Sequence, residues 1–121
     1  GRGAEVYQRT CIACHGQRGR GAPPAFPPLD GSDWIMDDPA LPIRIVLHGL
    51  QGPVRVGGTE FRNVMAPLGA VLSDAEIADV LTYVRQQWSN DAAPVTEADV
   101  AAVRAETAGR DEPWTGAELG R

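Results

Sequence analysis

Apolar residues recur with helical spacing at the start of the chain. Across residues 3–14, four positions fall on one face of a helix with a 3.6-residue period: Ala4, Tyr7, Cys11 and Cys14. Gly3 lies at the start of this segment, where the lack of a side chain would let another helix approach closely. The pattern predicts an N-terminal helix that packs on a later helix, with the Tyr7 ring filling the space between them.

Three further segments have the same periodicity. Residues 39–47 are mostly apolar, and Gly49, two residues further on, stands where a helix C′ glycine is expected. Residues 73–88 begin with Ser73 and Glu76, a capping box. The helix that follows has one apolar stripe, formed by Ile77, Val80, Leu81, Val84 and Trp88.

Residues 96–108 predict a last helix with Val100 and Val103 facing inward, and a lone Trp114 in the polar tail suggests that the tail folds back.

The segments between these helices follow different patterns. Residues 16–31 are rich in glycine and proline, which predicts an extended, stiff loop whose carbonyl oxygens are free to accept hydrogen bonds. Residues 53–61 contain two short β-like runs on either side of Gly57-Gly58, which predicts a small hairpin. Arg55 in this hairpin and Arg62 after it could pair with acidic groups of a cofactor or simply be solvated.

Composition narrows the classes of function. The 121 residues fit one domain, but only 6% are aromatic, and Gly and Pro total 24, so the core is thin unless a large apolar cofactor fills it. Residues 1–70 are nearly neutral, whereas residues 71–121 hold 4 Arg against 10 acidic residues. The chain has no Lys and a net charge of −5, so we expect no nucleic-acid partner.

The strongest chemical signal is the run Cys11-Ile12-Ala13-Cys14-His15. Two cysteines three residues apart followed by a histidine are typical of a c-type haem attachment site. On a helical turn both thiols face the same side and can add to two vinyl groups of one haem, while His15 takes an axial position on the iron. Three other interpretations of these five residues are less favoured. A disulfide between the cysteines would close a very short loop and so gain little chain entropy. A redox dithiol would need a βαβ context, which the sequence does not show, and a zinc site would have to use His48 as its fourth ligand.

Other residues could complete such a site. A haem-ligating histidine normally donates its second ring N–H to an acceptor, and we expect the carbonyl of Pro27 to serve, although this loop could be a plain rigid linker. Leu29 and Trp34 would then form walls of the haem pocket. Met65 precedes the clearest helix, and spacing alone leaves it either a second axial ligand or a core residue.

His48 has a separate interpretation. It lies in the last turn of a predicted helix, so a helix-end histidine with a local hydrogen bond is the favoured reading. A contact to a haem propionate, or a bond to the iron, is the sharper alternative.

With these motifs in view, residues 3–88 resemble class I monohaem cytochromes c. Gly3 and Tyr7 match the first of the two helices that cross in that family, and Val80 and Tyr83 match the second. The family's haem-facing Pro-x-Leu loop is similar to Pro27-Pro28-Leu29. The resemblance implies that Met65 is the axial methionine, although here Ala66 intervenes before the proline that commonly follows it directly.

The resemblance also implies a fold and a cofactor. We expect an all-α, class I cytochrome c fold, with helices around one covalently bound haem c, a small β-hairpin and a C-terminal helical extension. The cofactor would be haem c, with His15 and Met65 binding its iron. We expect a cytochrome c domain over residues 1–93 and an extension over residues 94–121 that wraps this domain.

The function implied is electron transfer without substrate chemistry, so the chain is not expected to be an enzyme. It would shuttle electrons between a quinol-oxidising complex and a terminal haem–copper oxidase as a monomer. The alternative is a cytochrome domain or subunit that accepts electrons from a periplasmic dehydrogenase. A third hypothesis is a ligand-binding or peroxidatic haem with an open distal side.

Haem attachment of this kind occurs outside the cytoplasm, so we expect a periplasmic protein or one on the outer face of the cytoplasmic membrane. The start at Gly1 suggests a processed or trimmed chain, from which an upstream membrane tether could have been lost.

Overall fold

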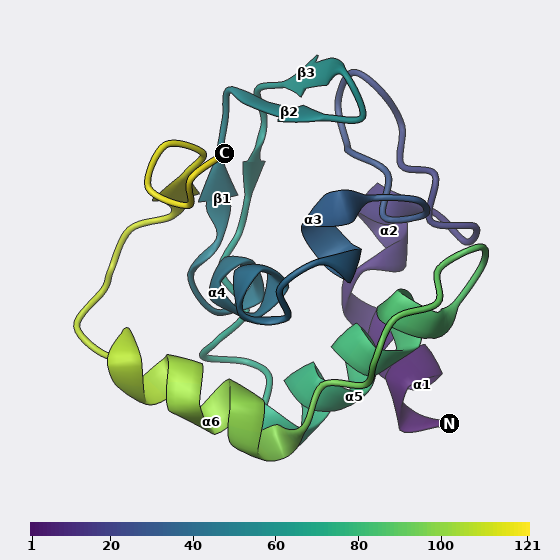
Figure 1. Cartoon of the computed structure of the whole chain (residues 1–121). Coiled ribbons are helices and arrows are strands. Elements are labelled where there is room, and N and C mark those ends of the chain that lie inside the picture. The colour runs from purple at the N-terminus through teal and green to yellow at the C-terminus, as the bar shows by residue number, and fades with distance from the viewer.

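The computed structural model describes residues 1–121 as a set of helices with two small sheets at one side (Figure 1). The helices are α1 (Arg2–Thr10), α2 (Ile12–His15), α3 (Asp33–Met36), α4 (Ala40–His48), α5 (Asp74–Gln86) and α6 (Glu97–Glu106). The strands are β1 (Leu50–Gln51), β2 (Val54–Val56), β3 (Thr59–Phe61), β4 (Val64–Met65) and β5 (Trp114–Thr115).

The N-terminal helix crosses α5, as its glycine and tyrosine predict. A Cβ atom added at Gly3 would lie 2.4 Å from the carbonyl oxygen of Asp79, so only glycine permits this approach. The Tyr7 and Tyr83 rings pack with their centroids 5.5 Å apart. The predicted single helix over residues 3–14 is wrong in one respect, because Cys11 leaves helical geometry at φ −121° and separates α1 from α2.

The later helices follow their sequence signals closely. Ser73 and Glu76 form the predicted capping box at the start of α5, and the helix ends at Gln86 rather than Trp88, which has φ 54°. Helix α4 ends at His48, and Gly49 after it has a φ of +86°, a conformation that glycine adopts readily. Helix α6 begins with a second capping box, from Thr96 and Asp99, and buries Val100 and Val103.

The strands form two separate sheets. Strands β2 and β3 pair antiparallel around Gly57-Gly58, with Val54 opposite Phe61. The other sheet has the order β4-β1-β5 and was not predicted from the sequence. Its strands are two residues long, too short for an alternating pattern, and they come from distant parts of the chain. The fold is therefore mostly helical rather than purely α-helical.

The C-terminal residues lie against the body of the molecule. Helix α6 packs along α5 and α4, and the chain then returns so that β5 pairs parallel to β1 (Figure 1). The indole Nε1 of Trp114 donates a 2.9 Å hydrogen bond to the carbonyl oxygen of Arg44. The Trp114 side chain therefore lies against α4.

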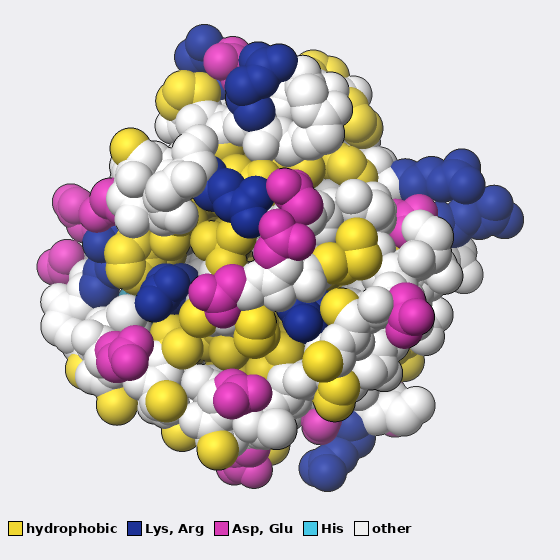
Figure 2. Space-filling model, viewed as in Figure 1, with side chains coloured by type: hydrophobic (Ala, Val, Ile, Leu, Met, Phe, Trp, Pro, Cys, Tyr) yellow, Lys and Arg dark blue, Asp and Glu magenta, His cyan; other side chains and the backbone are white.

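The surface is mixed in charge. On the face drawn in Figure 2, Arg and acidic side chains alternate, with apolar side chains between them. Val64 and Val71 are the large apolar residues most open to solvent, at 63% and 69% exposure. No helix has the length and apolar composition needed to cross a bilayer.

Candidate haem-binding site

The centre of the molecule contains one apolar cavity. Of the 19 residues that line it, 14 are hydrophobic. Cofactor and ligand pockets are mostly apolar, with a few polar groups that fix the orientation of what they bind. The lining therefore has the chemistry that a large planar apolar cofactor requires.

His15 is positioned on the wall of this cavity by α2. Its ring is buried, and Nδ1 lies 2.9 Å from the carbonyl oxygen of Pro27, as predicted. Since a carbonyl can only accept, Nδ1 carries the proton, and the Nε2 lone pair is left for another partner. Burial lowers the pKa of His15, while the bond to Pro27 opposes this shift. The ring is thus held neutral, which is the form that binds a metal.

The two cysteines lie beside this histidine as free thiols. Cys11 is half-buried and lines the cavity, whereas Cys14 is exposed. Burial raises the pKa of the Cys11 thiol, and a 3.4 Å contact with the Thr10 hydroxyl opposes this shift. The donor set on α2 and its N-cap residue Cys11 therefore consists of one neutral imidazole and two unpaired thiols, which fits covalent attachment of a haem.

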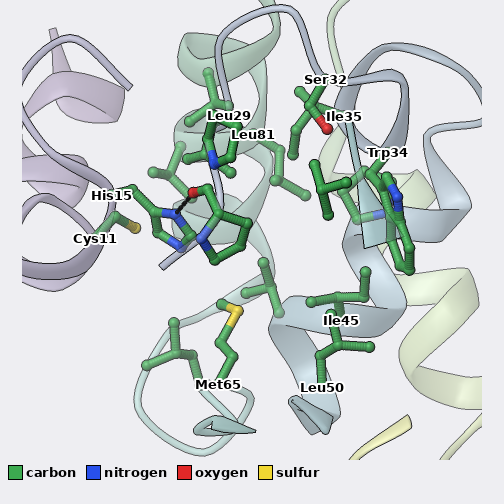
Figure 3. Close-up of a pocket in the computed structure, with 18 of the residues that line it drawn as sticks. Cys11, His15, Leu29, Ser32, Trp34, Ile35, Ile45, Leu50, Met65 and Leu81 are labelled. Carbon is green, nitrogen blue, oxygen red and sulfur yellow. Dashed lines mark hydrogen bonds between the residues drawn. The ribbon is translucent and has the colours of Figure 1, made fainter. Parts of the chain in front are cut away.

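Met65 lines the same cavity from β4, a different part of the chain. Figure 3 shows its sulfur and the His15 ring both directed into the cavity. Its strand is held by antiparallel pairing with β1, which places Met65 opposite Leu50. The other methionine, Met36, packs at the edge of the main core and does not line the cavity. Only one thioether is therefore available to a bound cofactor.

The predicted wall residues also lie at the cavity. Leu29 and Trp34 both line it (Figure 3), and the Trp34 indole Nε1 donates a 3.0 Å hydrogen bond to the carbonyl oxygen of Arg55. The Arg55 guanidinium itself donates to the Gly58 carbonyl, and Arg62 pairs with Glu60 at 2.9 Å. Both arginines are thus engaged within or beside the hairpin.

His48 does not face the cavity. Its Nε2 lies 2.7 Å from the Thr107 hydroxyl oxygen, and its ring packs edge-on against Trp114. The hydrogen bond expected to be local instead joins residues 59 positions apart. The alternative contact of His48 with a haem is wrong, because its ring is directed to the C-terminal segment.

Several wall residues were not identified from the sequence. They belong to apolar stripes or strands that are equally consistent with ordinary core packing: Ile45, Val46, Leu50, Val56, Val80 and Val84. A buried apolar face does not specify whether a neighbouring side chain or a cofactor covers it. The periodicity therefore marked Val80 and Val84 as core residues of a helix but could not mark them as part of a site.

Comparison with known proteins also indicates a haem-binding protein. The sequence model of the Cytochrome c family matches residues 1–88. Cytochrome c-552 of Thermus thermophilus is 38% identical over 92 residues, which cover 73% of this chain and 69% of that protein.

Two dehydrogenase subunits are also similar. The cytochrome c subunit of a Gluconobacter oxydans quinone alcohol dehydrogenase is 34% identical over 110 residues, covering 84% of this chain and 22% of the subunit. The gluconate 2-dehydrogenase cytochrome c subunit of Pantoea cypripedii is 37% identical over 108 residues, covering 84% and 24%. The chain thus spans less than a quarter of these subunits. The chain belongs to the cytochrome c family, as a class I cytochrome c, and its cofactor is a covalently attached haem c.

Proposed function

We propose that Cys11 and Cys14 attach the haem, that His15 and Met65 bind its iron, and that Pro27, Leu29 and Trp34 complete the site. The observation that carries this proposal is that His15 and Met65 reach one apolar cavity from separate elements. Each thiol would add its S–H across a vinyl double bond, forming a C–S bond at one carbon and placing the hydrogen on the other.

The cofactor supplies one-electron exchange between Fe(III) and Fe(II) when it is bound. The chain's own residues set the conditions for this exchange. The Pro27 carbonyl fixes the tautomer and orientation of His15 and raises its basicity. The Met65 thioether is a neutral, soft ligand, which favours the reduced state and raises the potential. The apolar walls exclude water, so little solvent reorganises when the charge changes.

This arrangement favours a one-electron carrier that performs no substrate chemistry. The primary function is transfer of electrons from a quinol-oxidising complex to a terminal haem–copper oxidase. The protein would act as a monomer in the periplasm or at the outer face of the cytoplasmic membrane, with or without a tether. The absence of Lys supports docking through apolar contacts rather than long-range attraction.

The second candidate is a cytochrome domain or subunit that accepts electrons from a periplasmic dehydrogenase. It is favoured by the similar proteins that are named as cytochrome c subunits of alcohol and gluconate dehydrogenases. Stopped-flow mixing of the oxidised protein with each donor separates the two functions. Rapid reduction by a quinol-oxidising complex supports the first, and rapid reduction only by a substrate-loaded dehydrogenase supports the second.

The ligand assignment is tested by replacing Met65 with Ala in the haem-loaded protein. The charge-transfer absorption of a methionine–iron(III) bond should disappear, and the potential should fall. Met36→Ala is the matched control, since this thioether does not line the cavity, and it should leave the absorption band unchanged. Retention of the band in Met65→Ala would overturn the assignment. It would then favour an open distal side.

We also propose that residues 1–93 form the cytochrome domain and that residues 94–121 are an extension wrapping it. The family match ends at residue 88, and α6 contributes Val100 and Val103 to the main core. A chain ending at residue 93 should still attach haem but unfold at a lower temperature. Failure to incorporate haem would show that the extension is part of the domain.

A further inference from the structure

The C-terminal strand shares a sheet with the strand that carries Met65. In the order β4-β1-β5, Leu50 of the central strand is opposite Met65 on one edge and opposite Trp114 on the other. These three residues therefore form one row across the sheet. Leu50 and Met65 both line the cavity, so the row runs from the cavity wall to the C-terminal segment.

Gly49 provides a second link between β4 and β5, the two edge strands of this sheet. The Trp114 N–H donates a 3.0 Å hydrogen bond to the Gly49 carbonyl oxygen. On its other side, a Cβ atom at Gly49 would lie 2.5 Å from the carbonyl oxygen of Met65. The backbone of Gly49 thus lies in contact with the backbone of Met65 with no side chain between them. A displacement of β1 would be transmitted directly to Met65.

The Trp114 side chain fixes the position of β1 from outside. Its Nε1 donates to the Arg44 carbonyl, and its ring packs against His48, so it touches two successive turns of α4. The Arg110 guanidinium covers the indole at 3.6 Å from the ring centre. Since α4 leads directly into β1, and the Trp114 backbone pairs with β1 while its side chain contacts α4, this one residue holds the end of the helix and the start of the strand together.

The residues after Met65 depend on the same helix. The N–H groups of Leu68 and Gly69 donate to the carbonyl oxygens of Val46 and Leu47, at 2.8 and 3.2 Å. The segment that presents Met65 is thus attached to α4 and β1 at both of its ends. Its position is only as well defined as the position of that helix and strand.

We propose that Trp114 is a positioning residue for Met65, which holds the thioether at the iron by fixing α4 and β1. This inference rests on the proposed role of Met65 as an iron ligand. With Trp114 removed, the β1–β4 pair gains freedom, and the thioether is displaced more readily by an added ligand. The haem attachment through α2 lies on other elements and should not change.

The experiment is an imidazole titration of the oxidised haem protein, followed through the methionine–iron(III) absorption band. Trp114→Ala should lower the imidazole concentration for half-displacement by roughly two- to thirtyfold, the usual range for coupling through packed elements. Trp114→Phe keeps a ring but loses the bond to Arg44, and it should give an intermediate shift. If Trp114→Ala does not fold, the shift measured for Trp114→Phe alone tests the positioning role.

The matched control is Trp88→Ala. The Trp88 indole also packs among aromatic rings and donates to a backbone carbonyl, that of Gln17 at 3.0 Å, but on the α1–α5 side. Equal midpoints for the Trp114 variants, Trp88→Ala and the unmodified protein would overturn the positioning role alone. Absence of the band in the unmodified protein, with unchanged imidazole binding in Met65→Ala, would overturn the ligand role and the inference with it.

Discussion

The Tyr7 hydroxyl donates a 2.6 Å hydrogen bond to the carbonyl oxygen of Gly16, the residue that follows His15. Tyr7 is almost fully buried between α1 and α5, so this bond joins the helix crossing to the end of the haem-attachment motif. Burial raises the pKa of the Tyr7 phenol, with smaller contributions from Cys11 and Tyr83. The hydroxyl therefore remains a protonated donor throughout the usual pH range.

Replacing Tyr7 with Phe should lower the free energy of unfolding by about 1 kcal/mol, since it leaves the Gly16 carbonyl without this partner. Denaturant titration of the haem protein measures the change. Tyr83→Phe, on the other ring of the pair, keeps the Tyr7 bond and is the matched control. Equal stability of Tyr7→Phe and the unmodified protein would show that the bond contributes nothing.

Gly3 gives a second prediction about the helix crossing. Alanine is ordinarily better than glycine inside a helix by about 0.5–1 kcal/mol. Here its Cβ would overlap the Asp79 carbonyl, so we expect Gly3→Ala to destabilise the protein by about 1–3 kcal/mol instead. Gly1→Ala, which meets no atom within 4 Å, is the control. A thermal melt in which Gly3→Ala is the more stable variant would contradict the close packing.

His48 should make stability depend on pH. Burial lowers its pKa below the ordinary 6.5, and Arg110 and Arg104 lower it further. Below about pH 6.5 the unfolded chain therefore takes up a proton that the folded chain resists. The contribution of His48 is present above that pH and is lost as the pH falls through the lowered value.

His48→Gln retains an N–H donor for Thr107 but cannot titrate. The stability difference between the two proteins, measured by denaturant titration between about pH 8 and pH 5, should move in favour of the variant as the pH falls. Parallel pH profiles for the two proteins would refute a role for this histidine.

Arg85 is expected to be important for stability. It is only 3% exposed, and its guanidinium donates to the Ala93 carbonyl at 2.8 Å and the Ile35 carbonyl at 2.6 Å. Arg85→Met would leave both acceptors unpaired, with an expected loss of about 3 kcal/mol. The control Arg62→Gln removes a largely exposed ion pair and should change the midpoint of denaturation little. Similar losses of stability in Arg85→Met and Arg62→Gln would contradict the greater importance of Arg85.

The parts of the fold that the sequence predicted are those encoded by local signals. The Ser73–Glu76 capping box and the apolar stripe defined α5, because both depend on residues within one or two turns. The β4-β1-β5 sheet could not be predicted in this way. Its pairing depends on where α4 and α6 place the chain, and a two-residue strand carries no period of its own.

The site shows the same contrast between features set by neighbouring residues and features set by distant contacts. The CxxCH run specified Cys11, Cys14 and His15 through chemistry that requires that spacing, and the free acceptor of the proline loop indicated Pro27. The hydrogen bond of His48 was expected to be local, but its partner, Thr107, caps the C-terminal end of α6 and lies 59 residues away. A single residue type at a helix end carries no information about such a distant contact.

The parallel pairing of β1 with β5 has a consequence for the order in which the molecule is assembled. The attachment cysteines precede Trp114 in the chain, so they are synthesised before it. A haem can thus be joined to residues 11–15 before the strand next to Leu50 is available. Maturation would then occur in two stages: covalent capture at an open cavity, followed by closure of the sheet.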